Sequence, residues 1–511
     1  MAKRDRFSFD GRSSGVLMHV TSLPGAMGSG DLSAEAFDFV DRLAEAKQTW
    51  WQMLPVGPPS APPGNSPYSS PSAFAGSPFL ISPERLVEDG LLDRADLKSA
   101  RAAPGGRADR VNFRRVRAVR WALLKRAYEN FASAPRAERR RFEAYCEREA
   151  GWLADDALYG ALKGAFDERP WFEWPRALRD REPSAIAGIR QRLAGAIEFH
   201  SFLQYLFDRQ WRALRGHARA RGVGLIGDMP IFVDHDSVPV WVQPDLWQLD
   251  RQRRPKLVSG TPPDAFCADG QHWGHPIYDW AAHERESFAW WVQRLAGAFE
   301  RFDGLRIDHF LGMVRMWAIP AGASTAANGK WAKVPGEALL KAIETALGKL
   351  PIIAEDLGLL TPEASALRDQ FALPGMRVLQ FGFVDPQGHG EYHRPYAYPL
   401  SSVAYTGTHD NDTIAGFLKS LPANLRRRVL AYAGSDGRAP HWDLIRGVMA
   451  SPANTAVFPM QDLLGLDARS RFNTPGRAEG NWGWRLRDGE FAAAVVKRLK
   501  ALTEMYDRGS D

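Results

Sequence analysis

The chain has 511 residues, of which 45% are hydrophobic and 11% aromatic, and this composition excludes disorder over most of its length. Its 66 basic and 60 acidic residues leave a net charge of +6 that is spread along the chain, so neither nucleic acid nor a membrane surface is an expected partner. The two cysteines, Cys146 and Cys267, are too few for a disulfide framework or a zinc ribbon.

The N-terminal residues do not have the pattern of a secretory signal, because they keep Asp5 and Asp10 and contain no sustained apolar run. No stretch of the sequence approaches the roughly 18 apolar residues that a membrane-spanning helix needs. Together with the sparse cysteines, these features predict a cytoplasmic protein.

Short apolar runs recur along the chain, and several end in a polar or charged residue followed by a turn signal. Such runs are typical of strands buried on both faces of a parallel sheet. They lie at 15–25, 50–59, 223–233, 304–310, 351–358, 375–383, 403–413 and 456–462. Helical patterns, such as the one at 35–46, lie between several of them, which predicts an α/β fold. Eight strands favour a (β/α)8 TIM barrel, although a doubly wound sheet gives similar segments.

A TIM barrel needs about 250 residues, so much of this chain must be insertion. We expect the barrel to start at 12–82 with two strands, to continue at 222–232 with the third, and to finish at 303–500 with strands four to eight. The segment 83–221 is predicted to be a mainly α-helical insertion, because apolar residues recur there at helical spacing: Val116, Val119, Leu123, Ala127 and Phe131. Within it, the arginine-rich stretch 136–141 favours a solvated helix face over a nucleic-acid site.

The segment 233–302 is rich in Trp, Pro and Gly, which favours an ordered loop over regular structure. It contains the pattern HWGHP, in which His272 and His275 would face one another on a helix as metal ligands. Because this pattern contains Gly and Pro, we expect hydrogen bonding in a loop instead.

Three acids each follow an apolar run: Asp308, Glu355 and Asp410. Period-two alternation places Arg306 on the same side of its strand as Asp308, where a guanidinium would hold the carboxylate ionised and oriented. The apolar approach to Glu355 suggests a desolvated carboxyl with a raised pKa, as a proton donor requires. Taken alone, each of the three acids could equally be an ordinary carboxylate that caps the end of a strand. Together with Arg306 and His409, the three favour glycosidic cleavage, in which one carboxyl attacks the sugar and another protonates the leaving oxygen.

Several segments, taken in order from about residue 15 to about residue 485, closely resemble the 4-alpha-glucanotransferases called amylomaltases. These form glycoside hydrolase family 77 of the alpha-amylase clan. The segments that carry the resemblance are NSPYSSPSAFAGSP (65–78), GDMPIFV (227–233), SGTPPDAFCADGQHWGHPIYDW (259–280), RIDHF (306–310), AEDLG (354–358), TGTHDNDT (406–413), RFNTPG (471–476) and NWGWR (481–485).

The resemblance implies a role for each of the three acids. Asp308 matches the family's nucleophile, Glu355 its general acid/base and Asp410 its transition-state stabiliser. It also implies that Trp273 lies in a loop over the donor cleft and that Asn473 lies on the acceptor side. The implied substrate-binding residues are Tyr68, Asp228, Trp273, Arg306, His309, His409 and Asn473.

The activity that the resemblance implies is transfer of α-1,4-glucan segments from maltodextrin, starch or glycogen to the 4-hydroxyl of glucose or another glucan, with retention of configuration. No metal or organic cofactor is expected. Two alternatives use the same residues: a glucan hydrolase with the same acids, and a non-catalytic glucan-binding protein. Loss of any of the three acids would support the second, and none is lost.

Overall fold

The protein is described from a computed structural model that covers residues 7–60, 65–101, 107–263, 269–358, 361–384 and 390–509. Eight parallel strands form a closed barrel in the spatial order β1-β12-β11-β10-β9-β6-β3-β2. Each of the eight apolar runs supplies one strand, which confirms the TIM barrel and excludes a doubly wound sheet, whose edges stay open. The strands are β1 (Ser13–Leu17), β2 (Trp50–Gln52), β3 (Gly224–Met229), β6 (Gly304–Ile307), β9 (Ile352–Ala354), β10 (Gly375–Val378), β11 (Ser402–Tyr405) and β12 (Thr455–Pro459).

Side chains along the barrel strands point alternately to the two faces of the sheet, so the core has two layers. Trp50 lies among side chains that fill the barrel, whereas its neighbour Trp51 belongs to the layer between strands and helices. Successive strand residues point to opposite faces, so both indoles are fully buried, each in a different layer. Phe9, in the N-terminal segment, stacks on Trp50 with ring centroids 4.8 Å apart and extends the barrel core.

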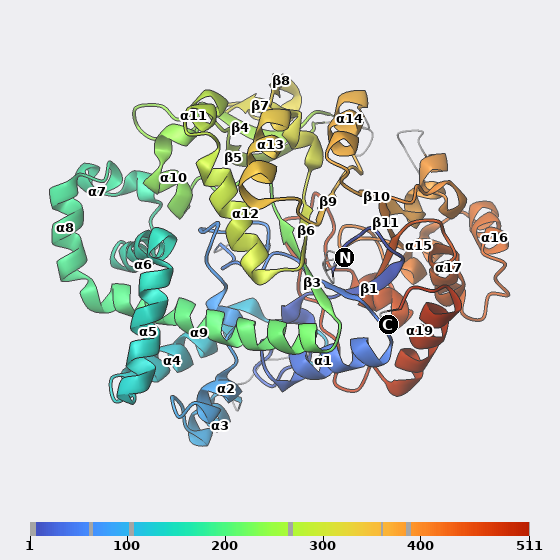
Figure 1. Cartoon of the computed structure of the whole chain (residues 1–511), viewed down its shortest axis with the longest axis horizontal. Coiled ribbons are helices and arrows are strands. Elements are labelled where there is room, and N and C mark those ends of the chain that lie inside the picture. Colours follow the sequence, from blue (N-terminus) through green and yellow to red (C-terminus); the bar gives the residue numbers. More distant parts are fainter. Residues whose placement is uncertain are drawn as a thin grey trace.

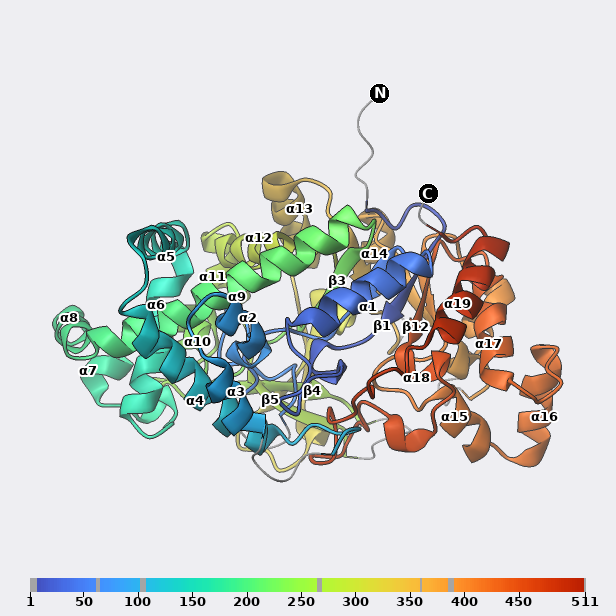
Figure 2. The same ribbon diagram turned by 90° about the horizontal axis from the view of Figure 1, so that it is seen from below.

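Helices surround the barrel, and three of them, α9 (Ala194–Ala220), α1 (Ala34–Glu45) and α19 (Ala493–Met505), lie side by side in that order (Figures 1 and 2). The helix expected at 35–46 is confirmed as α1. In the described part of the chain, the connection from β10 to β11 holds 3₁₀ turns in place of an α-helix.

The stretch between β2 and β3 is largely helical, as expected, and α5 to α8 extend to the left of the barrel in Figures 1 and 2. The spacing at 116–131 is that of α4, whose buried face carries Val116, Leu123 and Phe131. The arginines at 136–141 begin α5, where Arg141 pairs with Glu138, as expected for a solvated face. The helices are α2 (Pro83–Glu88), α3 (Arg94–Arg101), α4 (Phe113–Phe131), α5 (Arg136–Arg148), α6 (Ala150–Ala165), α7 (Arg176–Arg179), α8 (Pro183–Arg192) and α9.

The expectation of a loop at 233–302 is wrong for much of that segment. It contains α10 (Val238–Val242), α11 (Trp280–Arg285), α12 (Ala289–Arg301) and two strands, β4 (Leu257–Thr261) and β5 (Gln271–Pro276). These strands join β7 (Arg315–Pro320) and β8 (Lys330–Lys333), from a segment expected to be barrel, in an antiparallel sheet ordered β5-β4-β7-β8. One of the glycines that suggested a loop permits close strand contact: a Cβ at Gly260 would lie 2.1 Å from the Gln271 carbonyl oxygen.

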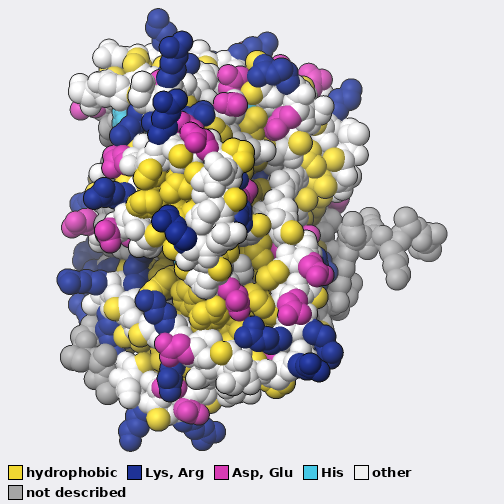
Figure 3. All heavy atoms as spheres, turned by 90° about the vertical axis from the view of Figure 1, so that its left-hand side faces the viewer, with side chains coloured by type: hydrophobic (Ala, Val, Ile, Leu, Met, Phe, Trp, Pro, Cys, Tyr) yellow, Lys and Arg dark blue, Asp and Glu magenta, His cyan; other side chains and the backbone are white. Residues whose placement is uncertain are grey.

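On the face seen in Figure 3, which is the left-hand side of Figure 1, basic and acidic side chains are interspersed around a hollowed hydrophobic region. Among the described residues, no helix is both long and apolar enough to cross a bilayer. Cys146 is a free thiol, and Cys267 lies outside the described residues.

Candidate active site

The carboxyl ends of neighbouring strands bring the predicted acids to one end of the barrel. Ile307 of β6 pairs with Ala354 of β9, so Asp308 and Glu355 are the first residues beyond paired positions. The Glu355 N–H donates to the Ile307 carbonyl at 3.1 Å, which continues the ladder to the point where the acid emerges. On the other side of β6, Arg306 pairs in register with Asp228 of β3. Active sites of such barrels lie at this end.

Arg306 holds two carboxylates at once. Its Nη1 lies 2.8 Å from both oxygens of Asp228, and its Nη2 lies 2.9 Å from Asp308 Oδ1. The expected same-side placement of Arg306 and Asp308 is confirmed. The side chains of Asp228 and Arg306 are 0% and 4% exposed, whereas that of Asp308 is 31% exposed and so open to a ligand. Burial opposes the charge on Arg306, but Asp228 and Asp308 outweigh it and raise the pKa of the guanidinium.

Glu355 is held by backbone N–H groups. His309 N donates to Oε2 at 2.7 Å, and Leu357 N donates to Oε1 at 3.0 Å. His309 has φ +54°, a left-handed conformation that non-glycine residues adopt at a cost and that is concentrated at functional sites. Burial raises the pKa of Glu355 to about 7 against the opposing charge of Arg306, and Asp308 adds to the rise. The raised pKa that the apolar sequence predicts is thus confirmed.

A chain of hydrogen bonds links the buried pair to the third acid. The Tyr68 hydroxyl donates to Asp228 Oδ2 at 2.7 Å and lies 2.8 Å from His409 Nε2, which lies 3.3 Å from Asp410 Oδ2. Asn473 Nδ2 donates to Asp410 Oδ1 at 2.6 Å, and Asn473 N donates to the His409 carbonyl. Residues from four distant parts of the sequence therefore form one continuous network.

The Asp410 carboxylate faces solvent at one side, with its side chain 44% exposed. Burial would raise its pKa, but the charge of His409 and the hydrogen bonds from His409 and Asn473 lower that pKa well below the usual range. Burial likewise opposes the charge on His409, and Asp410 outweighs it and raises the pKa of the imidazole. Asp410 and Glu355 thus have carboxyl pKa values shifted in opposite directions within one site.

Trp273 reaches the site from the antiparallel sheet. It lies on β5 and its indole is half-buried, perpendicular to the His309 ring with centroids 4.9 Å apart. The segment before β5 that carries part of the family motif, 264–268, lies outside the described residues. Trp482, which the sequence singled out only as part of a motif, packs near both Tyr68 and His409, with centroids 5.8 and 6.0 Å away. Its position in the NWGWR motif was the sequence signal that could have identified Trp482 as a site residue.

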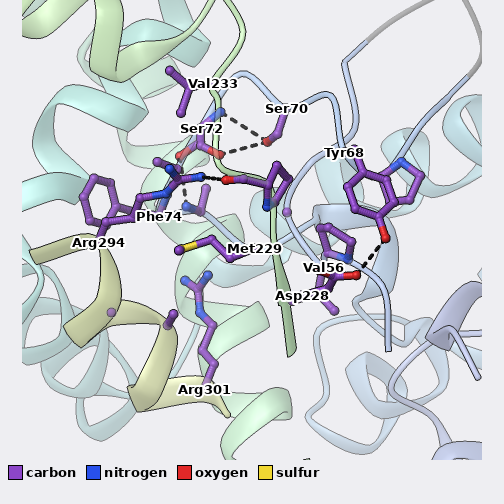
Figure 4. Close-up of a pocket in the computed structure, with 18 of the residues that line it drawn as sticks. Val56, Tyr68, Ser70, Ser72, Phe74, Asp228, Met229, Val233, Arg294 and Arg301 are labelled. Atoms are coloured by element: carbon purple, nitrogen blue, oxygen red, sulfur yellow. Dashed lines mark hydrogen bonds between the residues drawn. The ribbon is translucent and has the colours of Figure 1, made fainter. Parts of the chain in front are cut away.

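A cavity of about 100 Å³ lies beside Tyr68 and Asp228. Its walls come from the 67–75 segment, the end of β3 and α12, and Figure 4 shows the Tyr68–Asp228 hydrogen bond at one side of it and Arg294 and Arg301 of α12 at the other. Arg294 is engaged by the Pro230 and Ile231 carbonyls, to which it donates. The hydrogen-bond network of Tyr68 and Asp228 thus borders a cavity that residues of β3 and α12 also line.

The two histidines of HWGHP lie on strand β5, neither on a helix nor in a loop. His275 forms hydrogen bonds, as expected: its Nδ1 lies 3.0 Å from Ser259 Oγ and its Nε2 3.4 Å from Asp234 Oδ1. His272 is exposed. Within the described ranges, no group of three or more His, Cys, Asp or Glu side chains is arranged to hold a metal ion.

Comparisons with known proteins show the family of this chain. A family model described as 4-alpha-glucanotransferase matches residues 18–491. The 4-alpha-glucanotransferase of Thermus thermophilus is 45% identical to this chain over 506 residues, covering 97% of this chain and 99% of its own length. That of Synechocystis is 42% identical, covering 98% of each chain.

A solved structure agrees as well. The amylomaltase from Streptococcus agalactiae, solved in complex with acarbose, superposes with a TM-score of 0.94 at 38% identity, covering 98% of this chain and all of that one. An identity above 30% over nearly full length, together with the family model, establishes common descent. The chain therefore belongs to glycoside hydrolase family 77, the family of the 4-alpha-glucanotransferases.

Proposed function

We propose that the protein moves segments of α-1,4-glucan from a donor maltodextrin, starch or glycogen to the 4-hydroxyl of glucose or another glucan. The observation that carries the proposal is the pair of acids beyond adjacent strands: Asp308 is held by Arg306, and Glu355 has a pKa raised to about 7. One carboxylate is paired with a guanidinium, and the other keeps a proton near neutral pH. Retaining glycosidases use such a pair.

In the first step, Asp308 attacks the anomeric carbon of the donor sugar. The bond from that carbon to the glycosidic oxygen breaks, and the proton of Glu355 goes to the departing oxygen, which becomes the 4-hydroxyl of the released fragment. A β-glucosyl ester forms on Asp308. Arg306 frees one Asp308 oxygen for attack by holding the other, and Asp410 stabilises positive charge that develops on the sugar ring.

In the second step, the Glu355 carboxylate takes the proton of an acceptor 4-hydroxyl. The acceptor oxygen bonds to the anomeric carbon, the ester breaks, Asp308 is restored, and the new linkage is again α. Two inversions give net retention. Tyr68, Asp228, His309 and His409 surround the donor sugar in this proposal. Asn473, which orients Asp410, lies toward the acceptor.

Transfer must outcompete hydrolysis, because water is present at roughly 55 M, but well-oriented reactants reach effective molarities of about 10⁵ to 10⁸ M. Positioning of the acceptor therefore decides the outcome. We propose that Trp273 covers the donor side of the cleft, contributing a stacking face and excluding water, on the support of its contact with His309. The scarcity of cysteine supports a cytoplasmic location for this chemistry.

The test is incubation with maltotriose alone. We expect free glucose together with maltodextrins longer than the substrate, at a nearly constant number of reducing ends. Reducing ends that rise steadily, with no longer chains, would show a hydrolase. Binding of maltodextrin without any product would show a non-catalytic glucan-binding protein.

A further inference from the structure

Two consecutive buried residues lie just beyond the last barrel strand. They contact the segments that carry Asp410 and Asn473, the residue whose side-chain amide donates to Asp410. Gln461 and Asp462 lie in α18 (Met460–Leu463), directly after β12, and their exposed fractions are 2% and 1%. Neither side chain contacts the acids directly. Their hydrogen bonds go to the segment that contains Asp410 and to Ser470, three residues before Asn473.

Asp462 fastens both ends of one loop. Its Oδ2 accepts from Thr406 Oγ1 at 2.6 Å, and its Oδ1 accepts from Ile414 N at 2.8 Å. Thr406 is the first residue after β11, and Ile414 is the first residue of α15 (Ile414–Ser420). The two oxygens of a single carboxylate therefore hold the two ends of the segment 406–414, which contains His409 and Asp410.

Gln461 holds the second loop. Its Nε2 donates to the Ser470 carbonyl at 3.1 Å, next to the residues that approach Asp410 from the other side. Arg471 Nη2 donates to the Asp410 carbonyl at 2.5 Å, and its Nε donates to the Asn473 carbonyl at 2.6 Å. Asn473 in turn donates to the Asp410 carboxylate.

We propose that Gln461 and Asp462 are positioning residues for the Asp410 carboxylate. By holding the 406–414 and 470–473 loops to the short helix α18, which directly follows β12, they fix the distance and angle at which Asp410 meets the sugar. This inference rests on the proposed function, and it assigns a role to the last two residues of the apolar run 456–462, which the mechanism of the three acids does not use.

The contacts of Asp462 also predict which replacement preserves the role. Burial raises the pKa of Asp462 to about 7 despite the hydrogen bonds from Thr406 and Ile414, and the nearby Asp412 adds to the rise. The uncharged form is thus accessible near neutral pH. An asparagine in its place keeps an oxygen to accept from Ile414 N, and its amide donates to the Thr406 hydroxyl, which both accepts and donates. Alanine loses both bonds.

The experiment compares three variants with the wild-type enzyme in maltotriose disproportionation. Asp462→Ala is expected to lower kcat by about 10²-fold, because small displacements of catalytic groups have effects of that size. The KM for maltotriose is expected to change by at most about threefold, since the sugar contacts remain. Asp462→Asn should stay within about fivefold of wild type. Thr406→Val, which removes only one bond and keeps the shape, should lose about tenfold in kcat.

Ser402→Ala is the matched control. Ser402 is buried at the other end of β11 and donates to the Pro399 carbonyl, so its loss removes one buried hydrogen bond from the same strand. Its kcat should equal that of wild type at temperatures well below its unfolding midpoint. Thermal unfolding of each variant shows that the folded protein is measured, and Thr406→Val remains informative where Asp462→Ala does not fold.

Three results would overturn the inference: a kcat for Asp462→Ala and Thr406→Val equal to that of wild type, no recovery with Asp462→Asn, or an equal loss in Ser402→Ala. A wild-type enzyme that forms no longer maltodextrins from maltotriose would instead refute the proposed function. The two failures are therefore distinguishable.

Discussion

Arg306 and Asp228 face one another in register on adjacent strands, and a single guanidinium nitrogen lies 2.8 Å from both carboxylate oxygens. The same guanidinium extends to Asp308 at 2.9 Å. Because the Asp228 side chain is fully buried and that of Asp308 is partly exposed, the arginine connects the Asp308 carboxylate to a fixed group inside the barrel.

Replacement of Arg306 by methionine should destabilise the fold by about 3–5 kcal/mol, because it leaves the buried Asp228 without its cation. Urea unfolding of the variant and the wild type at the same pH measures this loss in the free energy of unfolding. Arg212→Met is the control, because Arg212 is half-exposed and pairs with Asp208 one helical turn away. Such surface pairs contribute about 0.5 kcal/mol or less. Equal losses in the two variants would contradict the arrangement.

Asp308→Asn and Glu355→Gln should fail at different steps. The amide of Asp308→Asn cannot attack, so no covalent intermediate forms with any donor. Glu355→Gln should lose about 10² to 10⁴ in rate on maltodextrins, because it lacks the proton donor. With a glycosyl fluoride donor, whose leaving group needs no proton, it should still form the ester. Mass spectrometry of the intact protein detects this adduct, and an adduct on Asp308→Asn would refute the nucleophile.

The dependence of kcat/KM on pH should follow the ionisation of the Glu355 carboxyl. Its carboxyl must carry a proton for the first step, and its pKa is about 7, so kcat/KM should fall as the pH rises above 7. Glu355→Gln assayed with the fluoride donor should lose this alkaline decline, because no group then needs to donate. Persistence of the same decline in that variant would assign it to another residue.

Asn473→Ala should move the acid limb of kcat to higher pH. The Asn473 amide helps to lower the pKa of Asp410, so without it that pKa rises and the carboxylate protonates earlier as the pH falls. We expect a loss of about 5- to 10-fold at the wild-type optimum. Asn473→Asp should lose more, because it places a second negative charge beside Asp410. An acid limb unchanged in both variants would argue against this role.

Trp273→Ala should raise the KM for long maltodextrins by about tenfold, since an aromatic contact contributes about 0.5–1.5 kcal/mol beyond its buried area. Trp331→Ala is the matched control. Trp331 belongs to the same antiparallel sheet but packs on Trp317 and Arg315, and Trp331→Ala should leave that KM unchanged. Initial rates measured with maltodextrin donors of increasing length distinguish the effect of Trp273→Ala from that of Trp331→Ala. Equal effects would attribute the change to the sheet as a whole.

The barrel could be predicted from the sequence because its signals are local. Each strand is a short apolar run, buried on both faces, and polar residues follow where the chain leaves the barrel. Arg306 and Asp308 illustrate this: a spacing of two on one strand fixes a common side, and the ion pair follows.

The antiparallel sheet could not be predicted in the same way. Strands β4 and β5 carry Gly and Pro, which signal loops, and β7, which pairs with β4, lies about 55 residues beyond it in the chain. Backbone pairing over that distance leaves no pattern within one segment, so local propensity pointed to the wrong structure.

The sequence by itself determined the eight strands, the helical insertion, and the three acids with the arginine beside one of them, since each depends on neighbouring residues. Only the tertiary structure decided that Asp410 is held by Asn473, that Trp273 reaches His309 from a second sheet, and that Asp462 fastens both ends of a loop. Hydrogen bonds between residues far apart in the chain exist only after folding, and the lowered pKa of Asp410 arises in part from its hydrogen bond with Asn473.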